Sequence, residues 1–152
     1  MDPDGLRPIR QGSFRNCQTL SASPAELGGL QFLLVWIPDR QDVIWIDCNP
    51  QVSREMRDIH PFLVLSPKAF NARTSLVIGL PMTTASYNTD NPFAVEVDSR
   101  KRGKHVASYV LCHQPKSFDW RLRQASNHPL KKLSSGRFRE VCERLNQIIK
   151  IA

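Results

Sequence analysis

The chain has 152 residues, 41% of them hydrophobic and 23% charged, which excludes a disordered chain and suits one domain that buries a core without disulfides or metal. The formal net charge of +7 is concentrated in residues 100–152, which hold 13 Lys or Arg against 3 Asp or Glu. Such a basic segment favours a polyanion or an acidic protein as the partner, although a solvated basic face explains the charge equally well.

Residues 1–34 are predicted to be a poorly ordered N-terminal extension, and residues 35–152 to form a single domain. Within the domain, short apolar runs stopped by Pro or Asn have the length and composition of β-strands. The predicted strands are residues 43–47, 62–65, 75–80, 92–97 and 105–112.

Polar links separate these predicted strands. They comprise a long loop at 49–59, a short turn or helix at 67–71, a loop at 83–91 and a basic turn at 99–104. Strands joined by short links pair mainly antiparallel, so the sequence predicts a small barrel with its polar groups at the strand ends. Any chemistry is expected at those ends.

The C-terminal segment carries the spacing of an amphipathic helix. Ser134 or Ser135 is available as its N-cap, and Lys150 is expected in its final turn. Arg137, Arg139, Glu140, Glu143 and Arg144 are expected to face water. The stripe predicted to pack on the sheet consists of Phe138, Val141, Leu145, Ile148 and Ile149.

The cysteines are scattered and do not show the Cys-x-x-Cys or Cys/His spacing of a zinc site. They are therefore expected to be reduced, mostly buried thiols of a cytoplasmic protein, and neither a metal nor another cofactor is implied. The four are Cys17, Cys48, Cys112 and Cys142.

Four motifs together resemble the MazF/PemK (Kid-like) family of toxin endoribonucleases, in their order and in their spacing. They are Pro-Asp-x-x-Asp-Val-Ile-Trp-Ile-Asp at 38–47, His-Pro-Phe-Leu-Val-Leu-Ser-Pro at 60–67, Pro-Met-Thr-Thr at 81–84 and Gln-Pro-Lys-Ser-Phe-Asp-Trp-Arg at 114–121. The resemblance runs from residue 35 to the C-terminus. It implies an SH3-like (CcdB/PemK-type) small barrel of antiparallel strands with a C-terminal α-helix, usually found as a homodimer.

The resemblance also implies an activity, with two departures from the family pattern. His60 stands where the family has an arginine thought to act as acid or phosphate clamp, and His113 stands where the Kid and PemK branch has an aspartate. An imidazole with the ordinary pKa of about 6.5 both gives and takes a proton, whereas a guanidinium stays charged. The two histidines therefore suggest a paired mechanism with one base and one acid. The alternative is that both are ordinary polar residues at strand ends and that catalysis is lost or has moved.

A threonine follows the third predicted strand. Thr83 matches the family threonine thought to bind the scissile phosphate, and Thr84 and Ser86 lie close enough in sequence to help. For an isolated Thr-Thr, a hydroxyl bonded to its own turn is the better expectation. Because of the resemblance, phosphate binding is the favoured role for Thr83.

The loop after the first strand supplies charged candidates. Glu55 matches a glutamate of some family members that orients the catalytic cation or acts as base, and Arg54 and Arg57 bracket it. Such an exposed stretch is more often a solvated loop. The case for function is its position between two strands at the expected substrate groove.

The segment after His113 combines amide, cationic and aromatic side chains. Gln114 and Lys116 are candidates for RNA contacts, because a phosphate binds lysine or arginine while a base stacks on an aromatic ring or guanidinium. Arg121 and Arg123 add to this composition, whereas Trp120 is expected in the core.

Three functions compete. The first is a metal-independent endoribonuclease (mRNA interferase) that cleaves single-stranded RNA at short specific sequences, as the toxin of a toxin–antitoxin module whose antitoxin carries an acidic, disordered tail. The second is a non-catalytic, CcdB-like module that acts on gyrase by contact alone. The third, a nucleic-acid-binding autoregulator, is the least favoured, because the sequence shows no helix-turn-helix signature.

Overall fold

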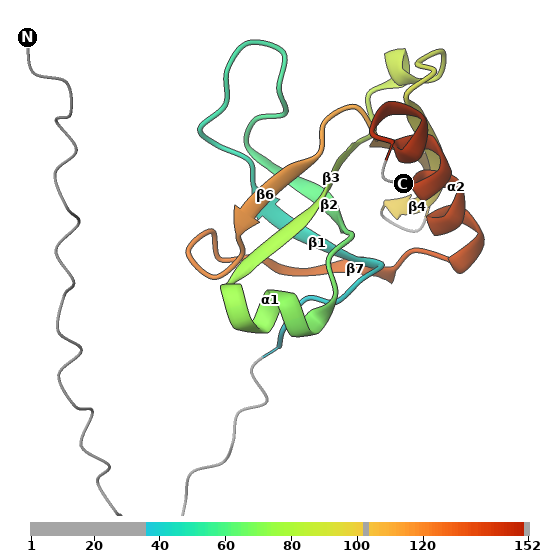
Figure 1. Ribbon diagram of the computed structural model, residues 1–152. Coiled ribbons are helices and arrows are strands. Elements are labelled where there is room, and N and C mark those ends of the chain that lie inside the picture. Colours follow the sequence, from blue (N-terminus) through green and yellow to red (C-terminus); the bar gives the residue numbers. More distant parts are fainter. Residues whose placement is uncertain (1–35, 102–103, 151–152) are drawn as a thin grey trace, which may run out of the picture. The chain divides into compact units, whose positions relative to one another are not determined.

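Antiparallel strands dominate the part of the protein that the structure describes (Figure 1). The computed structural model describes residues 36–101 and 104–150. The prediction of a mainly β fold of antiparallel strands with a C-terminal helix is confirmed. The strands are β1 (Asp42–Asp47), β2 (Ile59–Val64), β3 (Leu76–Thr83), β4 (Ala94–Lys101), β5 (Lys104–Leu111), β6 (Lys116–Asp119) and β7 (Ser126–Lys132); the helices are α1 (Lys68–Thr74), the short 3-10 helix η2 (Ser86–Asn88) and α2 (Ser135–Ile148).

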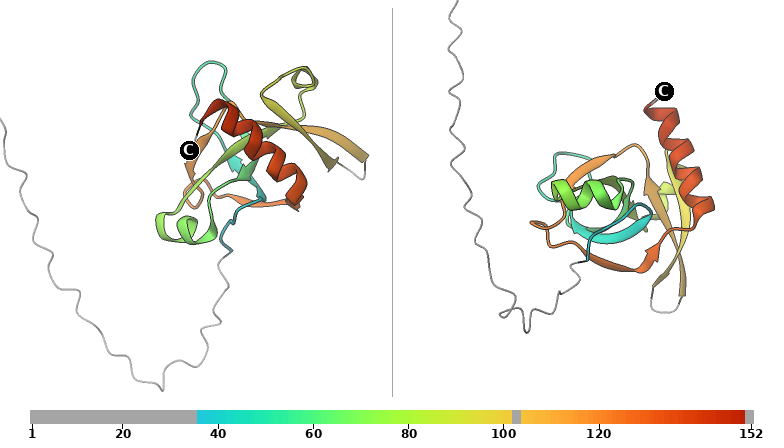
Figure 2. Two further views of the ribbon diagram at one scale, coloured as in Figure 1. Left: turned by 45° about the vertical axis from the view of Figure 1, so that its right-hand side comes forward. Right: turned by 60° about the horizontal axis from the view of Figure 1, so that its bottom comes forward.

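Strand β3 joins the parts of the sheet. Its first half pairs with β6, from Leu76 opposite Asp119 to Gly79 opposite Lys116. Its middle pairs with β2, and its last two residues pair with β5. The full strand order is β4-β5-β3-β2-β1-β7, with β6 off this path. Because one strand serves three partners in succession, the sheet curls, as both views of Figure 2 show.

The curled sheet buries apolar side chains on both faces. Val43 and Leu63 belong to one core cluster, whereas their neighbours Ile44 and Phe62 belong to the other. Strands β1 and β2 are therefore covered on both sides, which is why they occur in the sequence as continuous apolar runs. Helix α2 packs on the cluster that contains Val43 and Leu63, through its fully buried Val141.

Helix α2 begins as predicted but ends earlier. The Ser134 hydroxyl caps it by accepting the Arg137 N–H at 3.5 Å. The helix stops at Ile148, so the expectation that Lys150 lies in its final turn is wrong. Ile148 is 38% exposed, because the last turn runs past the cluster that holds Val141.

Other helix positions follow the prediction only in part. Phe138 and Leu145 pack on the core as expected, but Ile149 is 41% exposed. Arg144 is half-buried and donates a hydrogen bond to the Pro92 carbonyl, so it does not simply face water.

Strands β6 and β7 were not predicted from the sequence. β7 contains Pro129, and Leu130 is its only large apolar residue, so it lacks the apolar pattern that predicts a strand. It pairs with β1 at the end of the strand order, where a proline costs no ladder hydrogen bond. Strand β4 begins two residues later than predicted and ends four residues later, and β5 begins and ends one residue earlier, so the basic turn between them is shorter than predicted.

The described cysteines are free thiols, as predicted. Cys48 and Cys112 are buried and Cys142 is half-buried. Burial raises the pKa of the Cys48 and Cys112 thiols to about 11. Cys17 and the extension predicted at residues 1–34 lie outside the described residues. None of the described helices is long and apolar enough to cross a membrane.

Gly79 is predicted to be essential for the pairing of β2 with β3. A Cβ at this position would overlap the Leu63 carbonyl oxygen and lie 2.5 Å from Cε1 of Phe62. Both neighbours are fully buried, so neither can move aside easily. Gly79→Ala should lower the free energy of unfolding, measured by urea denaturation, by about 1–3 kcal/mol or more.

Gly136→Ala is the matched control. A Cβ on Gly136 would have no atom within 4 Å, and the residue lies in helix α2. That variant should be as stable as the parent or more stable, by up to about 1 kcal/mol. An equal loss of stability in both variants would contradict the packing argument.

Candidate functional site

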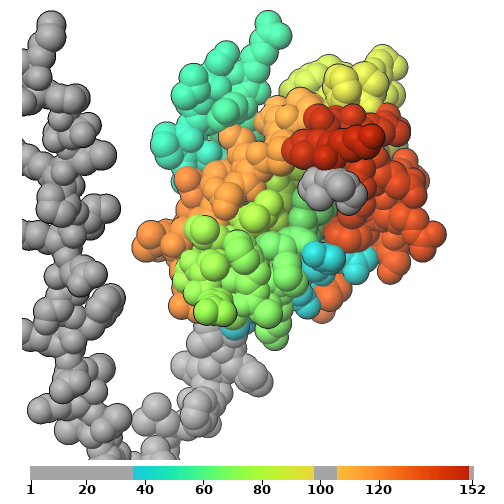
Figure 3. Space-filling view, viewed as in Figure 1, coloured from blue at the N-terminus to red at the C-terminus, as the bar shows by residue number. Residues whose placement is uncertain are grey.

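Two adjoining cavities lie between the β1–β2 loop, the β5–β6 link and the β3–β4 loop. Arg54, His113 and Gln114 line both cavities, so together these form one groove. In Figure 3 the β1–β2 loop (teal) and the β3–β4 loop (yellow) rise as separate projections with an indentation between them. The first cavity, of about 440 Å³, is also lined by Val52, Ser53, Glu55, Pro115 and Lys116; the second, of about 660 Å³, is also lined by Tyr87, Asn88, Asn91 and Leu111.

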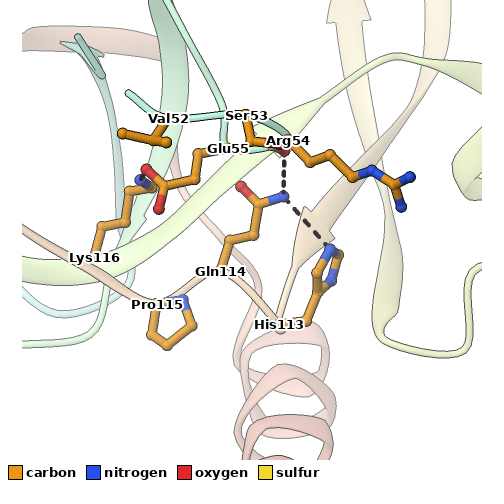
Figure 4. A pocket seen from close by; sticks show the side chains of 8 residues that line it. All are labelled: Val52, Ser53, Arg54, Glu55, His113, Gln114, Pro115 and Lys116. Atoms are coloured by element: carbon orange, nitrogen blue, oxygen red, sulfur yellow. Dashed lines mark hydrogen bonds and ion pairs between the residues drawn. The ribbon is translucent and has the colours of Figure 1, made fainter. Parts of the chain in front are cut away.

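Gln114 ties the β1–β2 loop to the β5–β6 link. Its Oε1 accepts the Met56 backbone N–H at 3.1 Å, which fixes the orientation of the amide. Its Nε2 then donates to the Arg54 carbonyl at 3.5 Å (Figure 4). The side chain predicted to contact RNA is thus engaged with the protein's own loop, on both sides of Glu55.

Glu55 and Lys116 form an ion pair in the first cavity. Oε2 of Glu55 lies 2.7 Å from Nζ of Lys116, which is the first residue of β6. The Lys116 side chain is only 15% exposed, against 50% for Glu55. The hydrogen bond and charge of Lys116 hold the pKa of the Glu55 carboxyl below its ordinary value. A carboxylate made less basic is a poor general base, so the geometry favours a cation-orienting role for Glu55.

His113 supplies an imidazole to the groove. It follows the buried Cys112 at the end of β5, and its own side chain is exposed. Its ring faces that of Phe93, with centroids 6.1 Å apart. The Gln114 amide nitrogen lies 3.5 Å from its Nε2 (Figure 4). An accessible imidazole next to a fixed donor suits proton transfer to a bound ligand.

His60 and Thr83 do not line either cavity. They lie at the same end of β2 and β3, each two residues beyond the opposed pair Phe62 and Pro81. His60 is half-buried, opposite Ile46 of β1. Thr83 is 8% exposed, and its hydroxyl oxygen accepts the Ala85 N–H at 3.2 Å. This is the turn bond expected of an isolated threonine, and it leaves the hydroxyl hydrogen able to donate.

The other predicted RNA contacts lie on the loops that border the groove. Arg57, Thr84 and Ser86 are exposed and do not line either cavity. Arg54 does line both.

Sequence reasoning missed the polar wall of the second cavity, which the β3–β4 loop supplies. Tyr87 is 80% exposed, while Asn88 is buried and bonded to Asn91 and to the Ala85 carbonyl. The available signal was an aromatic residue among loop asparagines directly after a strand, a composition suited to stacking and amide contacts with bases.

Residues after Lys116 support the fold more than the groove. Trp120 is 5% exposed and donates its indole N–H to the Asn71 carbonyl at 3.0 Å, which confirms its predicted core position. The Arg123 guanidinium donates to the carbonyls of Asp47, at 2.6 Å, and Asn49. It therefore closes the base of the β1–β2 loop.

Among residues 36–101 and 104–150, the structure does not gather three or more His, Cys, Asp or Glu side chains into a set that could hold a metal ion.

Comparison with known proteins finds relatives of this chain in sequence and in fold. Residues 39–149 match the family described as PemK-like, MazF-like toxin of type II toxin–antitoxin system. The endoribonuclease toxin MazF of Escherichia coli strain K12 is 34% identical over 91 residues, which span 60% of this chain and 77% of that protein.

Solved structures agree. MazF from Deinococcus radiodurans (Form-I) superposes with a TM-score of 0.65 and 29% identity, over 76% of this chain and 99% of that one. MazE–MazF (Form-II) from the same organism gives a TM-score of 0.60 and 26% identity, over 77% of this chain and 99% of that one.

The Gln114 amide is predicted to hold the loop in place. Gln114→Ala should speed hydrogen exchange of the Met56 amide by a factor of about 2 to 10, the value of one net hydrogen bond. Gln114→Glu keeps an acceptor for that N–H and should preserve its protection. NMR-detected exchange separates the two variants, and equal Met56 protection in Gln114→Ala and the parent would refute the role.

Proposed function

The chain belongs to the PemK-like, MazF-like family of toxins of type II toxin–antitoxin systems, and from this premise we propose that it is an endoribonuclease that cleaves single-stranded RNA. The observation that carries the proposal is the groove. It joins an imidazole, His113, to a lysine–carboxylate pair and to an exposed tyrosine. These are the groups that proton transfer, phosphate binding and base stacking require.

The proposed reaction needs a base, an acid and cations. A base removes the proton of a ribose 2′-hydroxyl, whose oxygen attacks the adjacent phosphorus. The bond to the 5′-oxygen breaks, and an acid protonates that oxygen, so the products are a 2′,3′-cyclic phosphate and a 5′-hydroxyl. Cationic donors stabilise the extra charge on the phosphorane.

His113 is the proposed proton-transfer group inside the groove. Arg54 and Lys116 are the proposed cations, because both line the first cavity beside it. His60 is proposed as the second imidazole and Thr83 as a phosphate donor. His60 and Thr83 lie at the same end of β2 and β3, which supports grouping these two residues. An RNA strand that spans this end of the sheet and the groove would contact both of them and the groove residues.

Partners follow from the same premise. We infer a cognate antitoxin whose acidic, disordered tail occupies the groove, since an acidic tail matches the cations that would otherwise bind phosphate. The similarity to the MazE–MazF structure from Deinococcus radiodurans supports the inference that this chain also binds a protein partner. A homodimer and a cytoplasmic location, where messenger RNA and free thiols occur together, complete the proposal.

Contact with gyrase alone is the less favoured alternative. A module that acts by protein contact has no need for an imidazole beside a lysine–carboxylate pair in a groove. The relative from Escherichia coli is, moreover, named an endoribonuclease toxin.

Incubation with end-labelled single-stranded RNA in EDTA tests the activity. The protein should cut at a few short sequences and leave a 2′,3′-cyclic phosphate and a 5′-hydroxyl, because its own side chains supply the acid and the base. Duplex RNA of the same sequence is the control and should stay intact. Intact single strands together with recovery of gyrase in a pull-down would favour the contact alternative.

Histidine variants test the mechanism. His113→Ala should lower the cleavage rate by about 10²- to 10⁴-fold, the usual contribution of a proton-transfer group. His128→Asn is the matched control, because His128 lies on β7 and its Nδ1 accepts the Leu130 N–H, a bond that asparagine can replace. That variant should cleave normally.

The paired-histidine mechanism makes a further demand. His60→Ala should also abolish most cleavage, and the parent should show a bell-shaped dependence of rate on pH. Full activity of His60→Ala beside an inactive His113→Ala would rule out the pair and leave a single catalytic histidine.

A further inference from the structure

The short polar contact between Lys116 and Glu55 in the groove joins two parts of the protein itself. The Lys116 ammonium lies 2.7 Å from the Glu55 carboxylate, a distance typical of a charge-assisted hydrogen bond. A carboxylate and a phosphate offer lysine the same kind of acceptor, an anionic oxygen. The place where an RNA phosphate would meet Lys116 is therefore taken by a loop side chain.

The loop segment that presents Glu55 is held on both sides. Gln114 bonds the Arg54 carbonyl on one side and the Met56 N–H on the other. The carboxylate is consequently kept next to Lys116 at a high effective concentration. It also shields the ammonium, which explains why the Lys116 side chain is only 15% exposed although it lines a cavity.

The other cation of this cavity is placed differently. In Figure 4 the Arg54 side chain extends away from Glu55, on the side of the cavity where His113 lies. Arg54 is exposed and also lines the second cavity. The groove thus presents one cation beside the imidazole and holds the other in an internal pair.

We propose that Glu55 is an internal competitor for the substrate, whose carboxylate occupies the Lys116 position that an RNA phosphate takes when a strand binds. This inference rests on the proposed function, since it assumes a polyanionic strand in the groove. Binding exchanges one anionic oxygen for another on the same ammonium, and the exchange requires the loop tip to give up its contact. Lys116 then discriminates in favour of ligands that bring a phosphate into the first cavity and can displace Glu55.

The test measures the dissociation constant for a fluorescent single-stranded RNA methylated at every 2′-oxygen, which lacks the attacking hydroxyl and cannot be cleaved. Glu55→Gln keeps the side-chain shape and removes the charge. It should tighten binding about two- to five-fold, the range expected for removing an exposed ion pair that must first break. In a Lys116→Met background, the same substitution should give no gain.

Asp58→Asn is the matched control for loss of a negative charge. Asp58 lies in the same loop but does not line either cavity, and its left-handed backbone, with φ of 65°, tolerates asparagine. An equal gain in Asp58→Asn would show a general charge effect and overturn the competition. So would an absent gain in Glu55→Gln, or a gain that persists without Lys116.

Cleavage of unmodified RNA by the parent protein separates the two claims. A protein that cuts RNA but binds the methylated strand no better after Glu55→Gln overturns the competition and leaves the ribonuclease. A protein that does not cut RNA but shows the Lys116-dependent gain overturns the ribonuclease and leaves the competition. A protein that neither cuts unmodified RNA nor binds the methylated strand overturns both.

Discussion

The close approach of strands β2 and β3 at Gly79 is the constraint on which the rest of the structure depends. The absent side chain lets the Leu63 carbonyl and the Phe62 ring come against the backbone of β3. At the same residue β3 is paired with Val64 on one side and with Lys116 on the other. Gly79 therefore lies where β3 meets both β2 and β6, the strand that begins with the groove lysine.

The groove depends on hydrogen bonds that hold the β1–β2 loop at its base and near its tip. Arg123 bonds the backbone where the β1–β2 loop leaves β1, and the Gln114 amide bonds it on both sides of Glu55. A polar loop of this length is otherwise expected to be mobile. The positions of Glu55, Lys116 and His113 relative to one another follow from these bonds and from the pairing of β6 with β3.

Much of the fold was predictable from the sequence, because the central strands bury both faces and appear as unbroken apolar runs. The core position of Trp120 was also predictable. β7 was not, since an edge strand needs little apolar patterning and tolerates Pro129. Within the groove, Arg54, Glu55, His113, Gln114 and Lys116 were identified by resemblance and by residue type.

The hydrogen-bond partner of each groove residue could not be predicted from the sequence. Whether Gln114 contacts a ligand or its own loop depends on the path of a loop 58 residues earlier in the chain, and no local pattern encodes that path. Tyr87 was missed for a related reason. An aromatic residue in a polar loop is a candidate for binding only once the fold shows that it lines a groove. The resemblance grouped His60 and Thr83 with His113, whereas the structure places the first two at the shared end of β2 and β3.

The central claim is that the groove between the two loops receives the nucleic acid. Backbone amide chemical shifts, recorded while a 2′-O-methylated single strand is added, test it most directly. If the strand binds in the groove, the largest changes fall on the Arg54–Met56 segment, on His113 and Gln114, and on Tyr87. Changes concentrated instead on β7, around Lys131 and Lys132, with the groove amides unmoved, would contradict it.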